Sequence, residues 1–129
     1  MESSDTMGYF PFFIDIKGKK CIIVGGGNVA ARKIEKLLPF EPDITVIAPE
    51  ISDDITSLNG IKIVKRKFKD DDINGAFFVI SASDDEQLNA HIFKLCRKKN
   101  ILVNTVDDLD KCGFIFPAVV HKNDITVGI

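Results

Sequence analysis

The sequence predicts an α/β protein built on a doubly wound parallel sheet. Short apolar runs alternate along the chain with helical or loop segments, as in folds whose strands are joined by helices. The runs at residues 21–24 and 76–80 are apolar throughout, which is typical of strands covered on both faces. Three consecutive glycines follow the first run and lead directly into a helical pattern. Strands connected in this way lie parallel, with right-handed crossovers.

The glycines form the first candidate binding motif. Residues 25–30, GGGNVA, match the fingerprint G-x-G-x-x-A at a strand-to-helix turn. In this Rossmann-like fingerprint the first glycine permits the tight turn and the second lets a pyrophosphate approach the backbone, while the small last residue lets helix and strand pack closely. The helix N-terminus adds unpaired N–H groups and a partial positive charge. The predicted nucleotide-binding residues here are Gly25, Gly27, Asn28, Val29 and Ala30.

The predicted helix after the glycines has one apolar face, and Pro39 ends it. That face consists of Val29, Ala30, Ile34, Leu37 and Leu38. Further strands are predicted at residues 44–47, 61–64, 76–80 and 101–103, with a turn at residues 59–60. A short helix is expected to reach Leu58. A longer one is opened by Asp84 and Asp85, ends in the basic run 97–99, and has an apolar face of Leu88, Ile92, Leu95 and Cys96.

The last seventeen residues have a different pattern. Two apolar runs, at residues 113–120 and 125–129, leave no room for a helix between them. They predict a β-hairpin that turns at residues 122–124, with Pro117 marking an edge or bulged strand. The hairpin either covers the end of the sheet or meets a second subunit. We therefore divide the chain into a Rossmann-like domain, residues 1–112, and a hairpin, residues 113–129.

Composition narrows the range of partners. A net charge of −2 gives no general attraction to nucleic acid or to an anionic membrane, and no apolar run is long enough to span a bilayer. The N-terminus lacks the pattern of a secretory signal, and three scattered cysteines resemble reduced thiols, so we expect a cytoplasmic protein. His91 and His121 have no second histidine or cysteine at ligand spacing, so no bound metal is expected.

The predicted ligand crevice lies beyond the carboxyl ends of the strands. This rule selects residues 25–30, residues 81–85 with Ser83, and residues 104–107 with Asn104. The ribose-binding acid is ambiguous, because the second strand continues into Ala48 and Pro49, and Glu50 follows. Glu50 either contacts the ribose or is a solvated loop acid. Since no Lys or Arg follows this strand to hold a 2′-phosphate, we expect NAD rather than NADP.

Five segments in this order resemble the N-terminal module of siroheme synthases, the precorrin-2 dehydrogenase and sirohydrochlorin ferrochelatase family. They are YFPFFIDIKGKKCIIVGGGNVAARKIEKLL, ITVIAPE, SASDDEQLN, VNTVDD and FIFPAVVHKNDITVGI. The resemblance covers residues 9–129. It implies NAD-dependent oxidation of precorrin-2 to sirohydrochlorin, a homodimer and, in bifunctional members, insertion of ferrous iron as a substrate. Members of the family continue past the hairpin into a helical domain, so we interpret residues 113–129 as the start of a truncated dimerisation region.

The resemblance places the family's catalytic aspartate at Asp107, in the motif Asn-x-Val-Asp. A carboxylate beside the cofactor crevice can serve as the general base for both reactions. The residues alone favour a solvated acidic loop at Asp107, and it is the resemblance that favours a catalytic role. The basic residues Lys65, Arg66, Lys67 and Lys69 are either a solvated surface or a site for the carboxylates of the tetrapyrrole.

A second functional class stays open at this point. Non-enzymatic NAD-sensing regulatory domains have the same glycine turn and a similar size. They keep an acid directly at the end of the second strand, where this chain has Ala48, and they lack the hairpin. A sensor would bind NAD without producing NADH.

Overall fold

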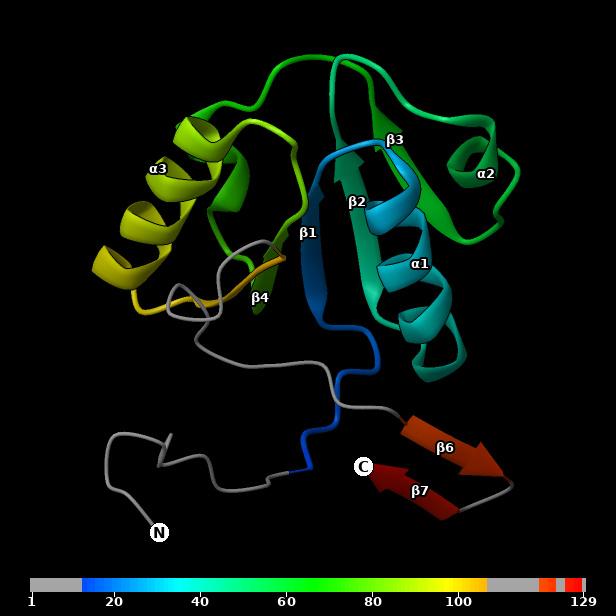
Figure 1. The fold of residues 1–129 in the computed structure, drawn as a ribbon. Helices are drawn as coiled ribbons and strands as arrows, with labels where there is room; N and C mark the ends of the chain where they lie inside the picture. Colours follow the sequence, from blue (N-terminus) through cyan, green and yellow to red (C-terminus); the bar gives the residue numbers. More distant parts are fainter. Residues whose placement is uncertain (1–12, 107–118, 123–124, 129) are drawn as a thin grey trace, which may run out of the picture.

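The computed structural model describes residues 13–106, 119–122 and 125–128. A parallel sheet of five strands, in the order β3-β2-β1-β4-β5, forms its centre (Figure 1). Its strands are β1 (Lys20–Val24), β2 (Asp43–Ile47), β3 (Ile61–Val64), β4 (Phe78–Ser81) and β5 (Leu102–Thr105). The α/β class and the parallel sheet predicted from the sequence are confirmed.

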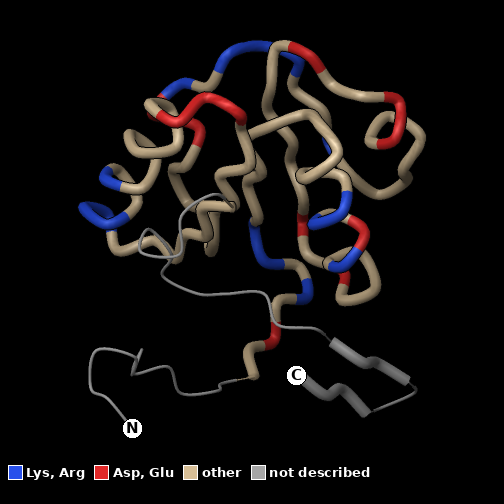
Figure 2. Tube along the Cα trace, viewed as in Figure 1, with Lys and Arg blue, Asp and Glu red and all other residues tan. Residues whose placement is uncertain are grey.

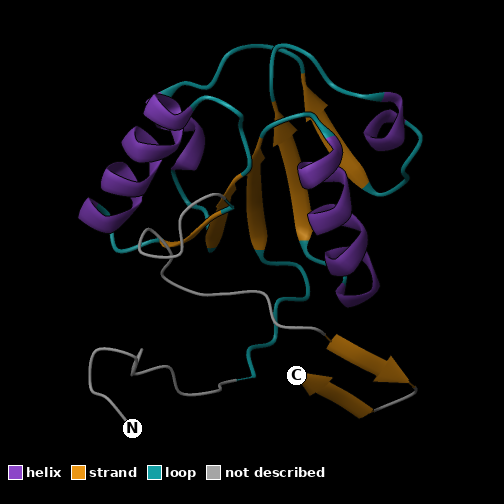
Figure 3. Cartoon of the chain, viewed as in Figure 1, coloured by secondary structure: helices purple, strands orange, loops and turns teal. Residues whose placement is uncertain are grey.

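Helices lie on both faces of this sheet (Figure 3). The helical elements are α1 (Asn28–Leu37), η2 (Leu38–Phe40), α2 (Asp53–Thr56), η3 (Asp70–Ile73) and α3 (Glu86–Lys98). In Figure 1, α1 and α2 are on one side of the strands and α3 is on the other. No helix in the described ranges is long and apolar enough to cross a membrane.

Side chains that alternate along the strands build two hydrophobic layers, one on each face. Ile23 on β1 packs with Ile34 of α1 and Ile55 of α2, whereas its neighbour Ile22 packs with Ile92 of α3 on the opposite face. All five isoleucines are at most 2% exposed. Full burial of one such side chain contributes about 1.5–3 kcal/mol to folding.

The register of the strands aligns their carboxyl ends. Val24 at the end of β1 pairs with Ile47 of β2 and with Ser81 of β4. Ile47 also pairs with Val64 of β3, and Ser81 with Thr105 of β5. All five strands therefore stop along one edge of the sheet, and the loops that follow them meet there.

Several element boundaries differ from the prediction by one or two residues. The fourth strand runs from Phe78 to Ser81, and the fifth from Leu102 to Thr105. The α-helix α1 ends at Leu37, before Pro39, as predicted. The chain continues directly into η2, because the fixed φ of Pro39 suits the first turn of that element.

The helical faces also differ at particular positions. Val29 is 41% exposed, and Ala31 is buried in its place on α1. On α3, Leu88 and Leu95 are half-buried, whereas the polar residue Asn89 is 1% exposed. The helical period predicted for α1 and α3 was correct, but apolar character alone did not identify which side chains are fully buried.

A separate antiparallel hairpin consists of β6 (Val119–Lys122) and β7 (Ile125–Gly128). Val119 pairs with Gly128, and Lys122 pairs with Ile125. The predicted pairing of these two runs is confirmed. The turn was predicted at residues 122–124, and Lys122 is the last residue of β6. Residues 123–124 and the predicted bulge at Pro117 lie outside the described residues.

Candidate nucleotide-binding site at the carboxyl ends of the strands

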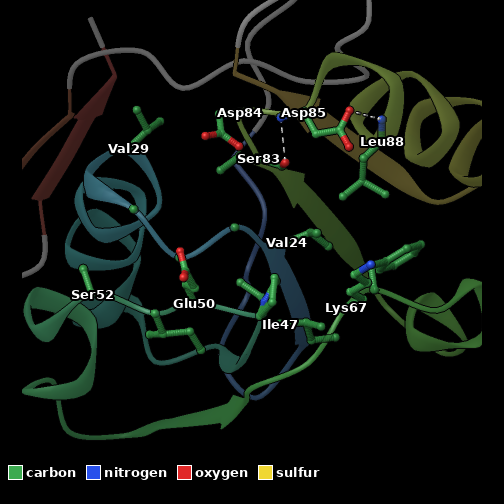
Figure 4. Close-up of a pocket in the computed structure, with 18 of the residues that line it drawn as sticks. Val24, Val29, Ile47, Glu50, Ser52, Lys67, Ser83, Asp84, Asp85 and Leu88 are labelled. Carbon is green, nitrogen blue, oxygen red and sulfur yellow. Dashed lines mark hydrogen bonds between the residues drawn. The ribbon is translucent and has the colours of Figure 1, made fainter.

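A cavity of about 900 Å³ lies where the strands end. Its walls are the glycine turn with the start of α1, the β2–α2 loop, the β4–α3 loop, and two residues that follow β3 (Figure 4). The volume is within the range of sites that take a cofactor or a drug-sized ligand. The predicted crevice is therefore present at the predicted edge of the sheet.

The three glycines of the turn differ in what surrounds them. Gly25 has a φ of +136°, and a Cβ there would lie 2.5 Å from the Ala82 carbonyl oxygen. A Cβ on Gly26 would overlap the Glu50 carbonyl oxygen. A Cβ on Gly27 would meet nothing within 4 Å. The fold itself thus requires the first two glycines, whereas Gly27 leaves open space in front of α1.

The N-terminus of α1 faces this space without a side-chain cap. Gly27 is the N-cap residue, and no acid occupies the first turn. The first intrahelical bond is donated by the Ala31 N–H to the Gly27 carbonyl, at 3.0 Å. The N–H groups of Asn28, Val29 and Ala30 therefore have no acceptor within the helix. Such groups, with the helix dipole, favour an anion at this end.

The β4–α3 loop forms the opposite wall. The Asp85 carboxylate caps α3 by accepting the N–H groups of Gln87 at 3.0 Å and Leu88 at 3.2 Å. The Asp85 N–H donates to the Ser83 hydroxyl at 2.9 Å (Figure 4). Asp85 therefore stabilises the helix and the loop, while Ser83 and Asp84 present their side chains at the cavity.

The β2–α2 loop supplies Pro49, Glu50 and Ser52 to the cavity. The Ser52 N–H donates to the Gly26 carbonyl at 2.8 Å, which fixes this loop against the glycine turn. The buried Ser52 hydroxyl has no hydrogen-bond partner within residues 13–106. It is a polar group that a ligand with hydroxyl or phosphate oxygens would satisfy.

The lining of the cavity carries charges of both signs. Figure 2 shows where acidic and basic residues lie along the backbone. Acidic side chains line the cavity at Glu50, Asp84 and Asp85, and Lys67 is the one cation among the described lining residues. The neighbouring Arg66 does not face the site. It forms a bidentate pair with Asp72, at 2.7 and 2.9 Å, and this pair holds the pKa of the Asp72 carboxyl below its usual range. Of the basic cluster, Arg66 is thus a structural residue.

Seven of the predicted site residues line the cavity: Gly25, Gly27, Asn28, Val29, Pro49, Glu50 and Ser83. Ala30 is fully buried, where its small side chain lets α1 pack closely on β1. Asn104 is 5% exposed at the end of β5 and does not line the cavity, because β4 lies between β5 and the glycine turn. Asp107 lies outside the described residues.

Sequence reasoning did not place eight of the lining residues in the cofactor crevice: Val24, Ile47, Ala48, Ile51, Ser52, Lys67, Phe68 and Leu88. Lys67 and Phe68 follow β3, so the carboxyl-end rule would have selected them had it been applied to the third strand as well. Leu88 was assigned to the core face of α3. Within the described ranges, no three His, Cys, Asp or Glu side chains gather as metal ligands would.

Comparison with known proteins gives a consistent result. Residues 12–118 match the family NAD_binding_7, described as "Putative NAD(P)-binding". Siroheme synthases of Actinobacillus succinogenes and Blochmanniella pennsylvanica are 38% and 40% identical over 126 residues. Each match covers 95% of this chain and 26% of the relative, so the chain spans about a quarter of the length of these proteins.

A solved structure titled "SirC, precorrin-2 dehydrogenase" has the same fold, with a TM-score of 0.80 and 26% identity. The match covers 94% of this chain and 61% of that one. The family match extends over most of the chain. The chain belongs to the family of NAD(P)-binding modules found at the N-terminus of siroheme synthases and in the SirC precorrin-2 dehydrogenase.

Proposed function

We propose that this chain is an NAD-dependent precorrin-2 dehydrogenase module, which oxidises precorrin-2 to sirohydrochlorin in siroheme biosynthesis. The observation that carries the proposal is the open space at Gly27 in front of the uncapped N-terminus of α1. A dinucleotide pyrophosphate placed there would accept hydrogen bonds from the N–H groups of Asn28 and Val29. The likeness to the SirC precorrin-2 dehydrogenase supplies the substrate class.

The cavity fits the rest of the cofactor as well. Glu50 and the unpaired Ser52 hydroxyl lie on the β2 side of the glycine turn, where the adenosine ribose would be held. Ser83, on the β4 side, would face the nicotinamide half. When bound, NAD supplies the hydride acceptor for the oxidation. We assign NAD rather than NADP because the Glu50 carboxylate would repel a 2′-phosphate.

Oxidation of the reduced tetrapyrrole releases a hydride to the cofactor and a proton to a base. We assign the base to Asp107. The Val106 N–H donates to the Ser81 carbonyl at 3.2 Å, so the residue before Asp107 is held beside the end of β4. The assignment of Asp107 as general base rests on the likeness of the motif Asn104-Thr105-Val106-Asp107 to the catalytic motif of the family. Insertion of ferrous iron stays a prediction from the resemblance, with iron as a substrate.

We further propose that the hairpin of β6 and β7 mediates a homodimer. The two strands form a sheet of their own, separate from the five-stranded one. An isolated two-stranded hairpin is marginally stable in water, so pairing with a second copy would stabilise it.

The buried free thiols of Cys21 and Cys96 suit a reducing compartment such as the cytoplasm.

The direct test is to mix the protein with NAD and precorrin-2 and to record both heat of binding and NADH absorbance. A dehydrogenase produces NADH only when both compounds are present. An NAD sensor would bind NAD and produce none. Absence of NAD binding would refute the proposed cofactor site and, with it, both alternatives.

A further inference from the structure

The buried side chain of Asn89 is hydrogen-bonded to the β4–α3 loop. Asn89 is on the first turns of α3 and is 1% exposed. The Ser81 hydroxyl donates to its Oδ1 at 2.6 Å, and its Nδ2 donates to the Ser83 carbonyl at 2.8 Å. Because a backbone carbonyl only accepts hydrogen bonds, the amide nitrogen must face Ser83 and the oxygen must face Ser81. The orientation of this amide is thus fixed by its two partners.

The loop that Asn89 holds is also pressed against the glycine turn. The Ala82 carbonyl lies so close to Gly25 that a side chain there would collide with it. The Ala82 N–H donates to the Val24 carbonyl at 2.8 Å. The loop therefore lies between the glycine turn and the Asn89 side chain, and Ser83 and Asp84 line the cavity from this position.

We infer that Asn89 is a positioning residue for the cofactor site. It acts through the Ser83 carbonyl by keeping the loop that carries Ser83 and Asp84 at the wall of the cavity, without contacting the ligand itself. Asparagine is a poor residue for a helix interior, and a buried amide costs free energy unless it is fully hydrogen-bonded. An apolar side chain could fill this position on the core side of α3, but it could not donate to the Ser83 carbonyl, and this bond is what connects α3 to the loop. This inference rests on the proposed NAD site.

The test compares Asn89→Ala with Ile92→Val, a control one turn along α3. Ile92 is fully buried and packs against the sheet, so its truncation lowers stability without touching the loop. NAD affinity is measured by calorimetry, and the melting temperature is measured for each variant. Loss of the bond to the Ser83 carbonyl is expected to weaken NAD binding about tenfold in Asn89→Ala. The control should bind NAD as the unaltered protein does, whatever its melting temperature.

Equal NAD affinity in Asn89→Ala and the unaltered protein would overturn the inference, as would equal weakening in the Ile92→Val control. If Asn89→Ala does not fold, Ser81→Ala takes its place. That variant removes one of the two bonds that orient the amide, and about threefold weaker NAD binding is expected. Unchanged binding in Ser81→Ala would then overturn the inference. Absence of NAD binding by the unaltered protein would refute the proposed function and this inference together.

Discussion

Replacing Gly27 with aspartate separates two properties that the glycine turn combines, namely the stability of α1 and the room for an anion. Gly27 has φ and ψ of −100° and −162°, an extended conformation that any residue adopts. A Cβ there meets nothing within 4 Å. The variant Gly27→Asp should therefore fold without strain. We expect it to be more stable than the parent protein and yet unable to bind NAD.

The gain in stability follows from capping. Aspartate at the N-cap is better than glycine by a few tenths of a kcal/mol, and its charge next to the helix N-terminus adds about 0.3–1 kcal/mol. A total of about 1 kcal/mol would raise the melting temperature of a protein of this size by about 2–5 °C. In the unaltered protein, α1 has no side-chain N-cap and no acid in its first turn, so the aspartate would replace no existing cap or charge.

The loss of binding follows from the same carboxylate. It would occupy the position proposed for the pyrophosphate and would accept the N–H groups intended for it. Two like charges about 4 Å apart repel by about 4 kcal/mol at the effective dielectric of a protein surface, which corresponds to more than a hundredfold in affinity.

Calorimetry with NAD and thermal unfolding on the same samples provide the assay. Gly27→Asn is the matched control, because it caps α1 with a neutral side chain of the same size. Its NAD affinity should fall less than that of Gly27→Asp. Undiminished NAD binding by Gly27→Asp would refute the assignment of the pyrophosphate to this turn.

Four further outcomes are expected. The variant Glu50→Gln should gain about fivefold in affinity for NADP relative to NAD, since a repulsive charge is removed; an unchanged ratio in calorimetry would place the ribose-binding acid elsewhere. Asp107→Ala should bind NAD normally but oxidise precorrin-2 about 10²–10⁴-fold more slowly, and near-normal turnover would make Asp107 a loop acid. Arg66 lowers the pKa of Asp72 in the folded state, so this pair stabilises the protein at neutral pH and loses its effect as the pH falls below about 4. The melting temperatures of Asp72→Asn and of the unaltered protein should therefore differ at pH 7 and converge in acid. Burial raises the pKa of the Cys96 thiol to about 11, so its alkylation at pH 8 should be more than about 100-fold slower than that of a free thiol. Mass spectrometry measures this rate, and rapid labelling would contradict the burial of Cys96.

Much of the fold was predictable because its elements have local signals. The apolar run from Cys21 to Val24 cannot face water on either side, and it became the central strand β1. The hairpin pairing followed from two apolar runs separated by too few residues for a helix. Strand ends were harder to predict, since the limits of β4 depend on its pairing with β1 and β5, which are distant in the sequence.

The site was predictable where a rule connects sequence to position. The carboxyl-end rule selected Gly27 and Ser83, and the expected position of a ribose-binding acid selected Glu50; all three line one cavity, whereas Asn104 does not. The distinct surroundings of the three glycines could not be derived from the sequence, because they depend on how closely the β2–α2 and β4–α3 loops approach the turn. The proposed role of Asn89 could not be predicted from the sequence for the same reason. Its sequence position suggests only a polar residue on an amphipathic helix, and its partners become apparent once α3 is packed on β4.

The central claim is that NAD binds across the carboxyl ends of the strands with its pyrophosphate at the start of α1. A titration of ¹⁵N-labelled protein with NAD, followed by NMR, tests it most directly. The account predicts saturable shifts of the backbone amides of Gly27, Asn28 and Ser83, with no change at Lys20 and Asp43 on the opposite edge of the sheet. Shifts confined to that opposite edge, or none at Gly27 and Asn28, would contradict it.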